Sequence, residues 1–65
     1  METPTVDEMF KELSYRGYYL CYLDDEWCFG HEFLDYDDFD LAFVKDKDKD
    51  TLIEKGYKLT CQRYS

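Results

Sequence analysis

The sequence has no run of about 18 apolar residues, so no segment is predicted to cross a membrane as a helix. It has no glycine-rich loop of the kind that binds phosphate groups, and no basic patch. Its N-terminus lacks the basic region and the long apolar segment of a signal peptide. These absences argue against a membrane helix, a nucleotide-binding loop and a secreted protein, and they predict a cytoplasmic protein.

Basic residues are absent from the stretch Asp24–Asp40, which we call the acidic band. The band holds eight of the sixteen acidic residues, and the eight acids outside it are balanced by the eight Lys and Arg. The whole net charge of −8 therefore belongs to the band. A net charge of this sign disfavours direct binding to nucleic acid or to anionic membranes, and it favours basic protein surfaces as partners.

The length of 65 residues predicts one domain, Met1–Ser65, with a small core and a loose end at Met1–Pro4. The chain is 45% hydrophobic and 20% aromatic, which is more than a disordered chain carries. The pattern of apolar residues predicts the element order α-β-β-β-α-β. We therefore expect an α+β domain with a mostly antiparallel sheet.

The first half of the chain predicts a helix followed by a β-hairpin. Apolar residues recur with helical spacing over Val6–Arg16, and Thr5 with Glu8 matches a capping box. Aromatic runs on both sides of Asp24–Asp25 predict two strands. A two-residue loop pairs Tyr22 with Trp27, Leu20 with Phe29 and Cys21 with Cys28, and places Tyr18, Leu20, Tyr22, Trp27 and Phe29 on one face. A loop of three residues, Asp24–Glu26, shifts this register.

The second half gives weaker signals. Alternation over Phe39–Lys45 predicts a third strand, with a short helix as the alternative. Thr51–Lys55 predicts a short helix that ends at Gly56. Alternation over Tyr57–Gln62 predicts a final strand. The segment Glu32–Asp38 is ambiguous.

The acidic band also carries aromatic residues, so it differs from a plain solvating tail. Alternate carboxylates on a strand lie roughly 6.5–7 Å apart, which is comparable to the spacing of phosphates in a nucleic acid. The band therefore predicts a surface that occupies the basic groove of a nucleic-acid-binding enzyme. The residues expected there are Asp24, Asp25, Glu26, Trp27, Asp35, Tyr36, Asp37, Asp38, Phe39 and Asp40. Whether Phe33, Tyr36 and Phe39 belong to this surface or to the core stays open.

In size and charge, though not by any motif, the chain resembles the small acidic inhibitors that bacteriophages deploy against host nucleases and defence systems. The resemblance implies a protein-binding inhibitor of the anti-defence type, which acts in the host cytoplasm. A plain alternative is a solvated acidic face that keeps an aromatic domain soluble. Another is a structural module without an inhibitory role, whose tyrosines and strand edges pair with a second copy.

A small zinc-binding domain is a further alternative, because Cys21, Cys28, His31 and Cys61 are the right number and type of ligands. Their spacing is unfavourable, since no Cys-x-x-Cys pair exists, and free cysteines more often fill buried positions. Cys21 and Cys28 instead suit a disulfide across the hairpin in an oxidising setting. Nothing in the sequence singles out a nucleophile or a pair of catalytic carboxylates, so we expect no enzyme, no metal and no cofactor.

Asp46, Asp48 and Asp50 resemble the opening of an EF-hand calcium loop. The resemblance then fails, because Thr51 replaces the glycine that makes the sharp turn and Tyr57 replaces the bidentate glutamate. The sequence therefore favours a polar turn or an exposed first helical turn.

Overall fold

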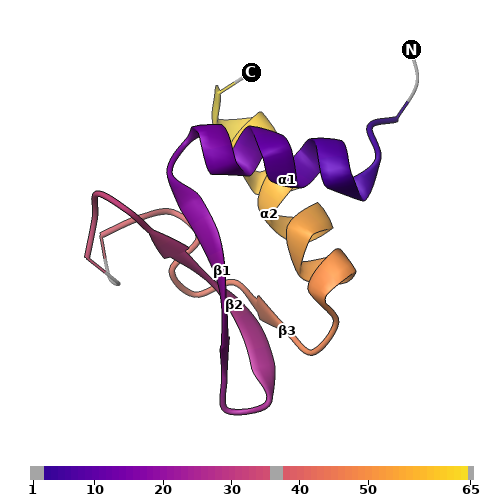
Figure 1. Ribbon diagram of the computed structural model, residues 1–65. Helices are drawn as coiled ribbons and strands as arrows, with labels where there is room; N and C mark the ends of the chain where they lie inside the picture. The colour runs from indigo at the N-terminus through magenta and orange to yellow at the C-terminus, as the bar shows by residue number, and fades with distance from the viewer. Residues whose placement is uncertain (1–2, 36–37, 65) are drawn as a thin grey trace.

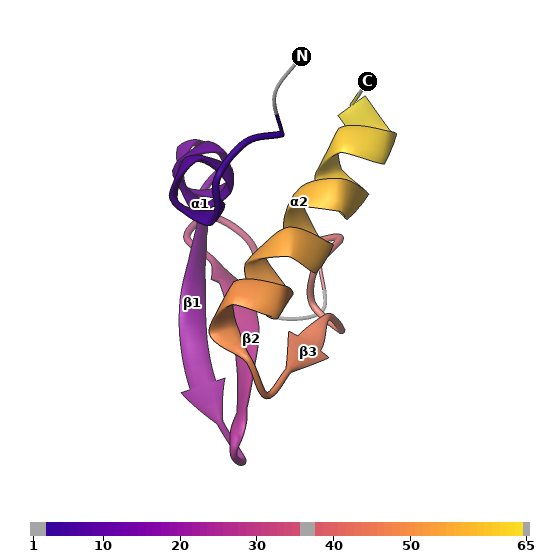
Figure 2. The same ribbon diagram turned by 90° about the vertical axis from the view of Figure 1, so that its right-hand side faces the viewer.

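The computed structural model describes residues 3–35 and 38–64. Within these residues the elements are α1 (Val6–Tyr15), β1 (Tyr18–Leu23), β2 (Glu26–His31), β3 (Lys45–Asp46) and α2 (Lys49–Tyr64), as Figure 1 shows. The strands form one antiparallel sheet in the order β1-β2-β3. Helix α2 crosses one face of the sheet, and α1 packs against α2 near the start of β1 (Figure 2). The predicted α+β class with an antiparallel sheet is confirmed.

Helix α1 begins and ends as its local sequence predicts. The Oγ1 of Thr5 accepts a hydrogen bond from the backbone N–H of Glu8 at 3.2 Å, and Oε1 of Glu8 accepts one from the N–H of Thr5 at 3.4 Å. These reciprocal bonds form the predicted capping box. At the other end, Arg16 is the C-cap and Gly17 has a φ of 93°. Glycine suits this left-handed conformation because it has no Cβ.

The β-hairpin closes with a two-residue turn. Asp24 and Asp25 have φ values of 53° and 64°, which is the type I′ conformation that matches the twist of two antiparallel strands. The pairs Tyr22–Trp27, Leu20–Phe29 and Cys21–Cys28 are those expected for the two-residue loop. The three-residue alternative is excluded.

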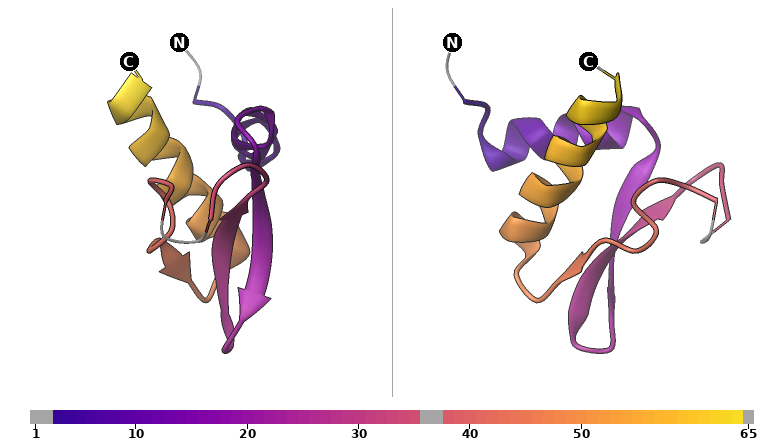
Figure 3. Two further views of the ribbon diagram at one scale, coloured as in Figure 1. Left: turned by 90° about the vertical axis from the view of Figure 1, so that its left-hand side faces the viewer. Right: turned by 180° about the vertical axis from the view of Figure 1, so that it is seen from behind.

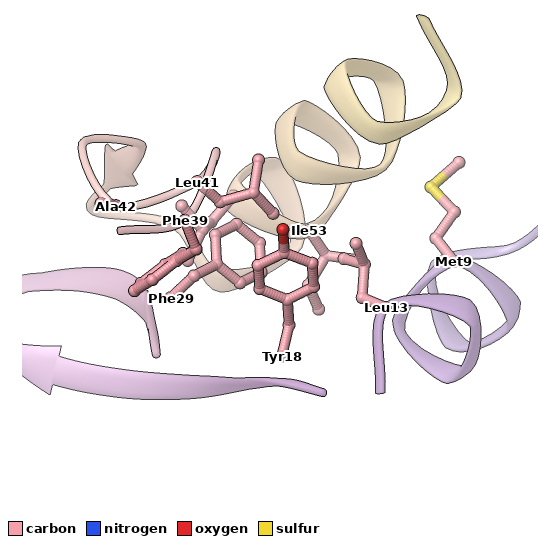
Figure 4. Close-up of a cluster of buried hydrophobic side chains, with 9 residues drawn as sticks. Met9, Leu13, Tyr18, Phe29, Phe39, Leu41, Ala42 and Ile53 are labelled. Atoms are coloured by element: carbon pink, nitrogen blue, oxygen red, sulfur yellow. The ribbon is translucent and has the colours of Figure 1, made fainter. Parts of the chain in front are cut away.

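The core lies between α2 and the face of the hairpin that carries Tyr18 and Phe29. Phe29 is 1% exposed; its ring lies 6.1 Å from that of Tyr18 and packs against Gly56 of α2. Figure 4 shows how these side chains converge from the two helices, the hairpin and the loop after β2. The buried cluster is Met9, Leu13, Tyr18, Phe29, Phe39, Leu41, Ala42, Leu52 and Ile53.

The prediction of a strand over Phe39–Lys45 is wrong. Residues 38–44 form bends and turns, and only Lys45–Asp46 pairs with β2. The alternation is misleading because the neighbouring residues Leu41 and Ala42 are both buried, whereas Phe43 is 76% exposed. Turn hydrogen bonds join Ala42 N–H to the carbonyl oxygen of Phe39 and Val44 N–H to that of Leu41.

The predictions of a short helix that ends at Gly56 and of a final strand over Tyr57–Gln62 are also wrong. Helix α2 continues from Lys49 to Tyr64. Its buried positions are Leu52, Ile53, Gly56 and Thr60, which lie on one helical face. Gly56 is buried against Phe29, so it serves close packing and does not end the helix. The element order is therefore α-β-β-β-α.

Helix α2 begins with carboxylates that cap it. Oδ2 of Asp48 accepts hydrogen bonds from the N–H and the hydroxyl of Thr51, at 2.9 and 2.8 Å. Asp46 accepts a hydrogen bond from the N–H of Asp48 and forms an ion pair with Lys55, with 2.6 Å between Nζ and Oδ2. The Lys55 ammonium group lowers the pKa of Asp46, and the N–H of Thr51 lowers the pKa of Asp48. The EF-hand-like stretch is thus a helix start.

We expect these two carboxylates to make the domain less stable in acid. An unfolded Asp titrates near pH 4, and a lower pKa in the folded state means that the stabilisation is present above that pH. It is lost as the pH falls through the folded pKa values. Asp48→Asn keeps a capping side chain but removes the titration, so its free energy of unfolding should decline less between about pH 5 and pH 2.

The matched control is Asp50→Asn, which removes one exposed carboxylate from the same helix end. Urea unfolding at a series of pH values measures the free energy of unfolding for each protein. The control should decline with acid as the wild type does. Equal declines for Asp48→Asn and the wild type would show that the cap does not contribute to the acid sensitivity.

Candidate protein-binding surface

The first acidic group is at the tip of the hairpin and consists of Asp24, Asp25 and Glu26, which we call the tip acids. The type I′ turn holds Asp24 and Asp25 at the end of the strands, where both are exposed. The neighbouring Tyr22 and Leu23 are 55% and 61% exposed. The tip projects away from both helices (Figure 1). Asp24 and Asp25 are therefore accessible to a partner, and Glu26 beside them is half-buried.

The second acidic group lies in the loop after β2 and consists of Glu32, Asp35, Asp38 and Asp40, which we call the loop acids. All four are exposed. The N–H of Asp38 donates to the carbonyl oxygen of Asp35 at 2.9 Å. Between the exposed Asp38 and Asp40, the side chain of Phe39 enters the core. The core thus holds this part of the loop with its carboxylates outward.

His31 fixes the start of this loop to the end of α1. Its Nε2 lies 2.8 Å from the carbonyl oxygen of Arg16, and its Nδ1 accepts a hydrogen bond from the N–H of Phe33 at 3.1 Å. These partners require the neutral tautomer that carries its proton on Nε2. The imidazole also meets the ring of Tyr18 edge-on at 4.8 Å. The histidine therefore ties the first residues of the loop to the end of α1.

The two acidic groups lie at opposite ends of the hairpin. Each strand has six residues, so the ends are roughly 20 Å apart. The expected row of carboxylates along a third strand is wrong, because residues 38–44 are not extended. The acidic band is instead divided into two groups, one at the hairpin turn and one in the loop that follows β2.

Between the acidic groups, the hairpin presents a face that points away from the core. We call it the outer face, and Tyr19 and Leu23 are its large exposed side chains, at 45% and 61%. Leu34 joins them around a shallow hollow of about 120 Å³. Figure 3 (left) shows that no helix of the described residues covers this side. The outer face consists of Tyr19, Cys21, Leu23, Glu26, Cys28 and Gly30.

The aromatic residues expected as anchors are placed differently. Phe39 is 7% exposed and belongs to the core, so it is not available as an anchor. Trp27 is half-buried; the ring of Tyr22 lies 5.1 Å from it and Nζ of Lys49 lies 5.7 Å from its ring centre. Tyr36 and Asp37 lie outside the described residues. Phe33, whose position was left open, is 78% exposed.

Sequence reasoning missed Tyr19 and Leu34 as surface residues. The signal for Tyr19 was present, because strand alternation places it opposite the core-facing Tyr18 and Leu20. Leu34 had no such signal, since its position depends on the path of the loop. The exposed apolar side chains around this hollow are therefore Tyr19, Leu23 and Leu34, whereas the ring of Phe33 lies against that of His31, at 5.8 Å.

The cysteines and the histidine are not arranged as the alternative of a zinc-binding domain would require. Cys21 and Cys28 face each other on the outer face, but His31 bonds to Arg16 and Cys61 is on α2. Among residues 3–35 and 38–64, no three His, Cys, Asp or Glu side chains are grouped so that they could hold a metal ion. The described part of the chain therefore offers no candidate metal site.

No protein-family model, curated protein or solved structure matches this chain. In the described part of the chain, no helix is both long and apolar enough to span a membrane.

Proposed function

We propose that this chain is a small acidic inhibitor that occupies the basic nucleic-acid-binding surface of a target enzyme. The observation that carries the proposal is the pair of exposed acidic groups at the two ends of one hairpin. No Lys or Arg interrupts the sequence from Asp24 to Asp40. Such an inhibitor of host nucleases or defence enzymes works by binding, without catalysis, in the cytoplasm.

The spacing of the acidic groups suits an extended basic groove. Roughly 20 Å corresponds to about six nucleotide steps at 3.4 Å each. A groove that holds several phosphates carries Lys and Arg over the same length. The tip acids and the loop acids would meet the two ends of that groove and give a fast, salt-sensitive encounter.

The outer face supplies apolar contact between these charged ends. Tyr19, Leu23 and Leu34 are partly exposed around a hollow, so a partner's side chain can bury them further. Binding energy in protein interfaces is concentrated in such central aromatic and apolar residues, with charges at the rim. In this proposal they replace Trp27 and Phe39 as the anchors.

The test is capture from a low-salt cell lysate on the immobilised protein. The test variant is Asp24→Asn/Asp25→Asn/Asp35→Asn/Asp38→Asn, and the matched control is Asp7→Asn/Glu12→Gln/Asp50→Asn/Glu54→Gln, which removes the same charge from the helices. We expect nucleic-acid-binding proteins on the wild type and the control, released between about 50 and 200 mM salt. Equal loss of these proteins from both variants would show that only net charge matters.

Self-association is the second candidate, and the uncovered edge of β1 favours it. In the described residues β1 pairs only with β2, and Tyr19 and Tyr22 on it are exposed. A second copy could pair with this edge and cover the apolar side chains. Sedimentation at high salt separates the candidates, because an apolar dimer persists there whereas binding to a basic surface is lost.

A further inference from the structure

Cys21 and Cys28 face each other in the middle of the outer face. At the open end of the hairpin, the N–H of Glu32 donates to the carbonyl oxygen of Gly17 at 2.8 Å. Antiparallel pairs alternate between hydrogen-bonded and non-hydrogen-bonded, so counting from this bond makes Cys21–Cys28 a hydrogen-bonded pair. Its two Cα atoms are then about 5.5 Å apart, close to the separation that disulfides prefer. The Cα separation therefore suits a disulfide, and the Cβ atoms, which are about 5.5 Å apart in such a pair, have to approach by roughly 1 Å to form it.

The two thiols are free and unequal in exposure, and their side chains are within hydrogen-bonding reach of each other. Cys28 is 4% exposed, whereas Cys21 is half-exposed beside the hollow. Burial raises the pKa of Cys28, and so do the Cys21 side chain's charge and its hydrogen bond with Cys28. Lys45 of β3 pairs with Cys28 of β2, and its positive charge lowers the pKa of Cys28. Cys21 is thus the thiol that a reagent in solution meets first.

We propose that Cys21 and Cys28 are a redox site that forms a reversible disulfide with a low-molecular-weight disulfide such as oxidised glutathione. The Cys21 thiolate attacks the reagent's S–S bond, forms a mixed disulfide and releases one thiol. The Cys28 thiolate then attacks the Cys21 sulfur and releases the second thiol. The protein loses two protons and two electrons, which reduce the reagent's disulfide to two thiols. This inference does not depend on the proposed inhibitor function.

The disulfide would be a reversible cross-link that stabilises the folded domain. A domain of this size has a small core, and a cross-link restricts its unfolded state. Cys61 is excluded from the pair because α2 covers the other face of the sheet (Figure 2). The hairpin that carries the tip acids would then be more rigid in oxidising than in reducing conditions.

The first test maps the bond in the folded protein after equilibration with oxidised glutathione and alkylation of the remaining thiols. Trypsin cleaves after Arg16 and Lys45, so Cys21 and Cys28 are in one peptide, residues 17–45, and Cys61 is in another, residues 59–63. We expect the first peptide to be lighter by two hydrogens and unalkylated, with Cys61 alkylated. A persistent glutathione adduct on Cys21, or a cross-link to Cys61, would overturn the proposal.

The second test compares the folded chain with the same chain in urea over a range of glutathione redox buffers. We expect the folded Cys61→Ser variant to form the bond at least about tenfold more readily than the unfolded one, because the hairpin holds the thiols together. The Cys28→Ser/Cys61→Ser variant should form only the glutathione adduct. Equal or weaker bond formation in the folded chain would show that the hairpin opposes the bond.

Discussion

Gly56→Ala should lower the free energy of unfolding by about 1–3 kcal/mol, even though alanine favours helices over glycine by about 1 kcal/mol. A Cβ at this position would lie 2.5 Å from Cζ and 2.6 Å from Cε2 of Phe29, and 3.2 Å from Cδ1 of Leu41. Phe29 and Leu41 are both fully buried, so neither can move without disturbing the core. A domain of 65 residues has a total stability of only about 3–10 kcal/mol. Urea unfolding measures the loss.

Gly30→Ala is the matched control, because its Cβ would also meet a ring, that of Tyr19 at 2.5 Å. Tyr19 is 45% exposed and can turn into solvent, so the loss should be smaller. Adding Phe29→Leu to Gly56→Ala should cost less than the two single losses together, since the smaller side chain makes room for the Cβ. A Gly56→Ala protein that is more stable than the wild type would contradict the close crossing of α2 and β2.

Asp24→Asn/Asp25→Asn should weaken binding to a captured basic partner by about tenfold or more at low salt, mainly through a slower association rate. The turn should be preserved, because Asn adopts the left-handed conformation as readily as Asp. Glu12→Gln/Glu54→Gln changes the net charge equally, at exposed positions on the helices, and should have a much smaller effect. Surface plasmon resonance at two salt concentrations measures both rates.

The binding result has two informative alternatives. If both double variants weaken binding equally, the affinity depends on the net charge of the protein and the tip acids make no specific contact with the partner. If neither weakens it, the interface lies elsewhere on the domain. Only a selective loss from the hairpin variant supports recognition by the tip.

The first half of the fold could be predicted because its signals are local. The capping box of Thr5 and Glu8 and the type I′ turn at Asp24–Asp25 each lie within a few residues of sequence. The turn length then determines every pair in the hairpin, including Cys21–Cys28. These features do not depend on distant contacts.

The second half could not be predicted because distant contacts decide it. Glycine often ends a helix, but Gly56 instead makes room for Phe29, which is 27 residues earlier in the sequence. The alternation over Tyr57–Gln62 suggested a strand, yet the burial of Gly56 and Thr60 follows a helical face. The pattern of apolar residues alone does not show that this segment packs as a helix across the sheet.

Part of the candidate surface could be predicted from the sequence, because the charged residues of a turn or loop are usually exposed. Of the acids named for partner binding, Asp24, Asp25, Asp35, Asp38 and Asp40 are exposed, and Glu26 is half-buried. Phe39 was misplaced because the loop turns it into the core beside Tyr18, at 5.8 Å between the rings. The path of an irregular loop has no periodic signal, so its aromatic residues could not be assigned.

The most direct test of the proposed function is competition with nucleic acid for a purified, captured partner. A labelled DNA duplex is bound to the partner at low salt, and the unlabelled acidic protein is added in increasing amounts. The account predicts that the protein displaces the duplex completely, with an apparent affinity that falls steeply as salt is raised. A ternary complex, in which the duplex stays bound while the protein also binds, would contradict it.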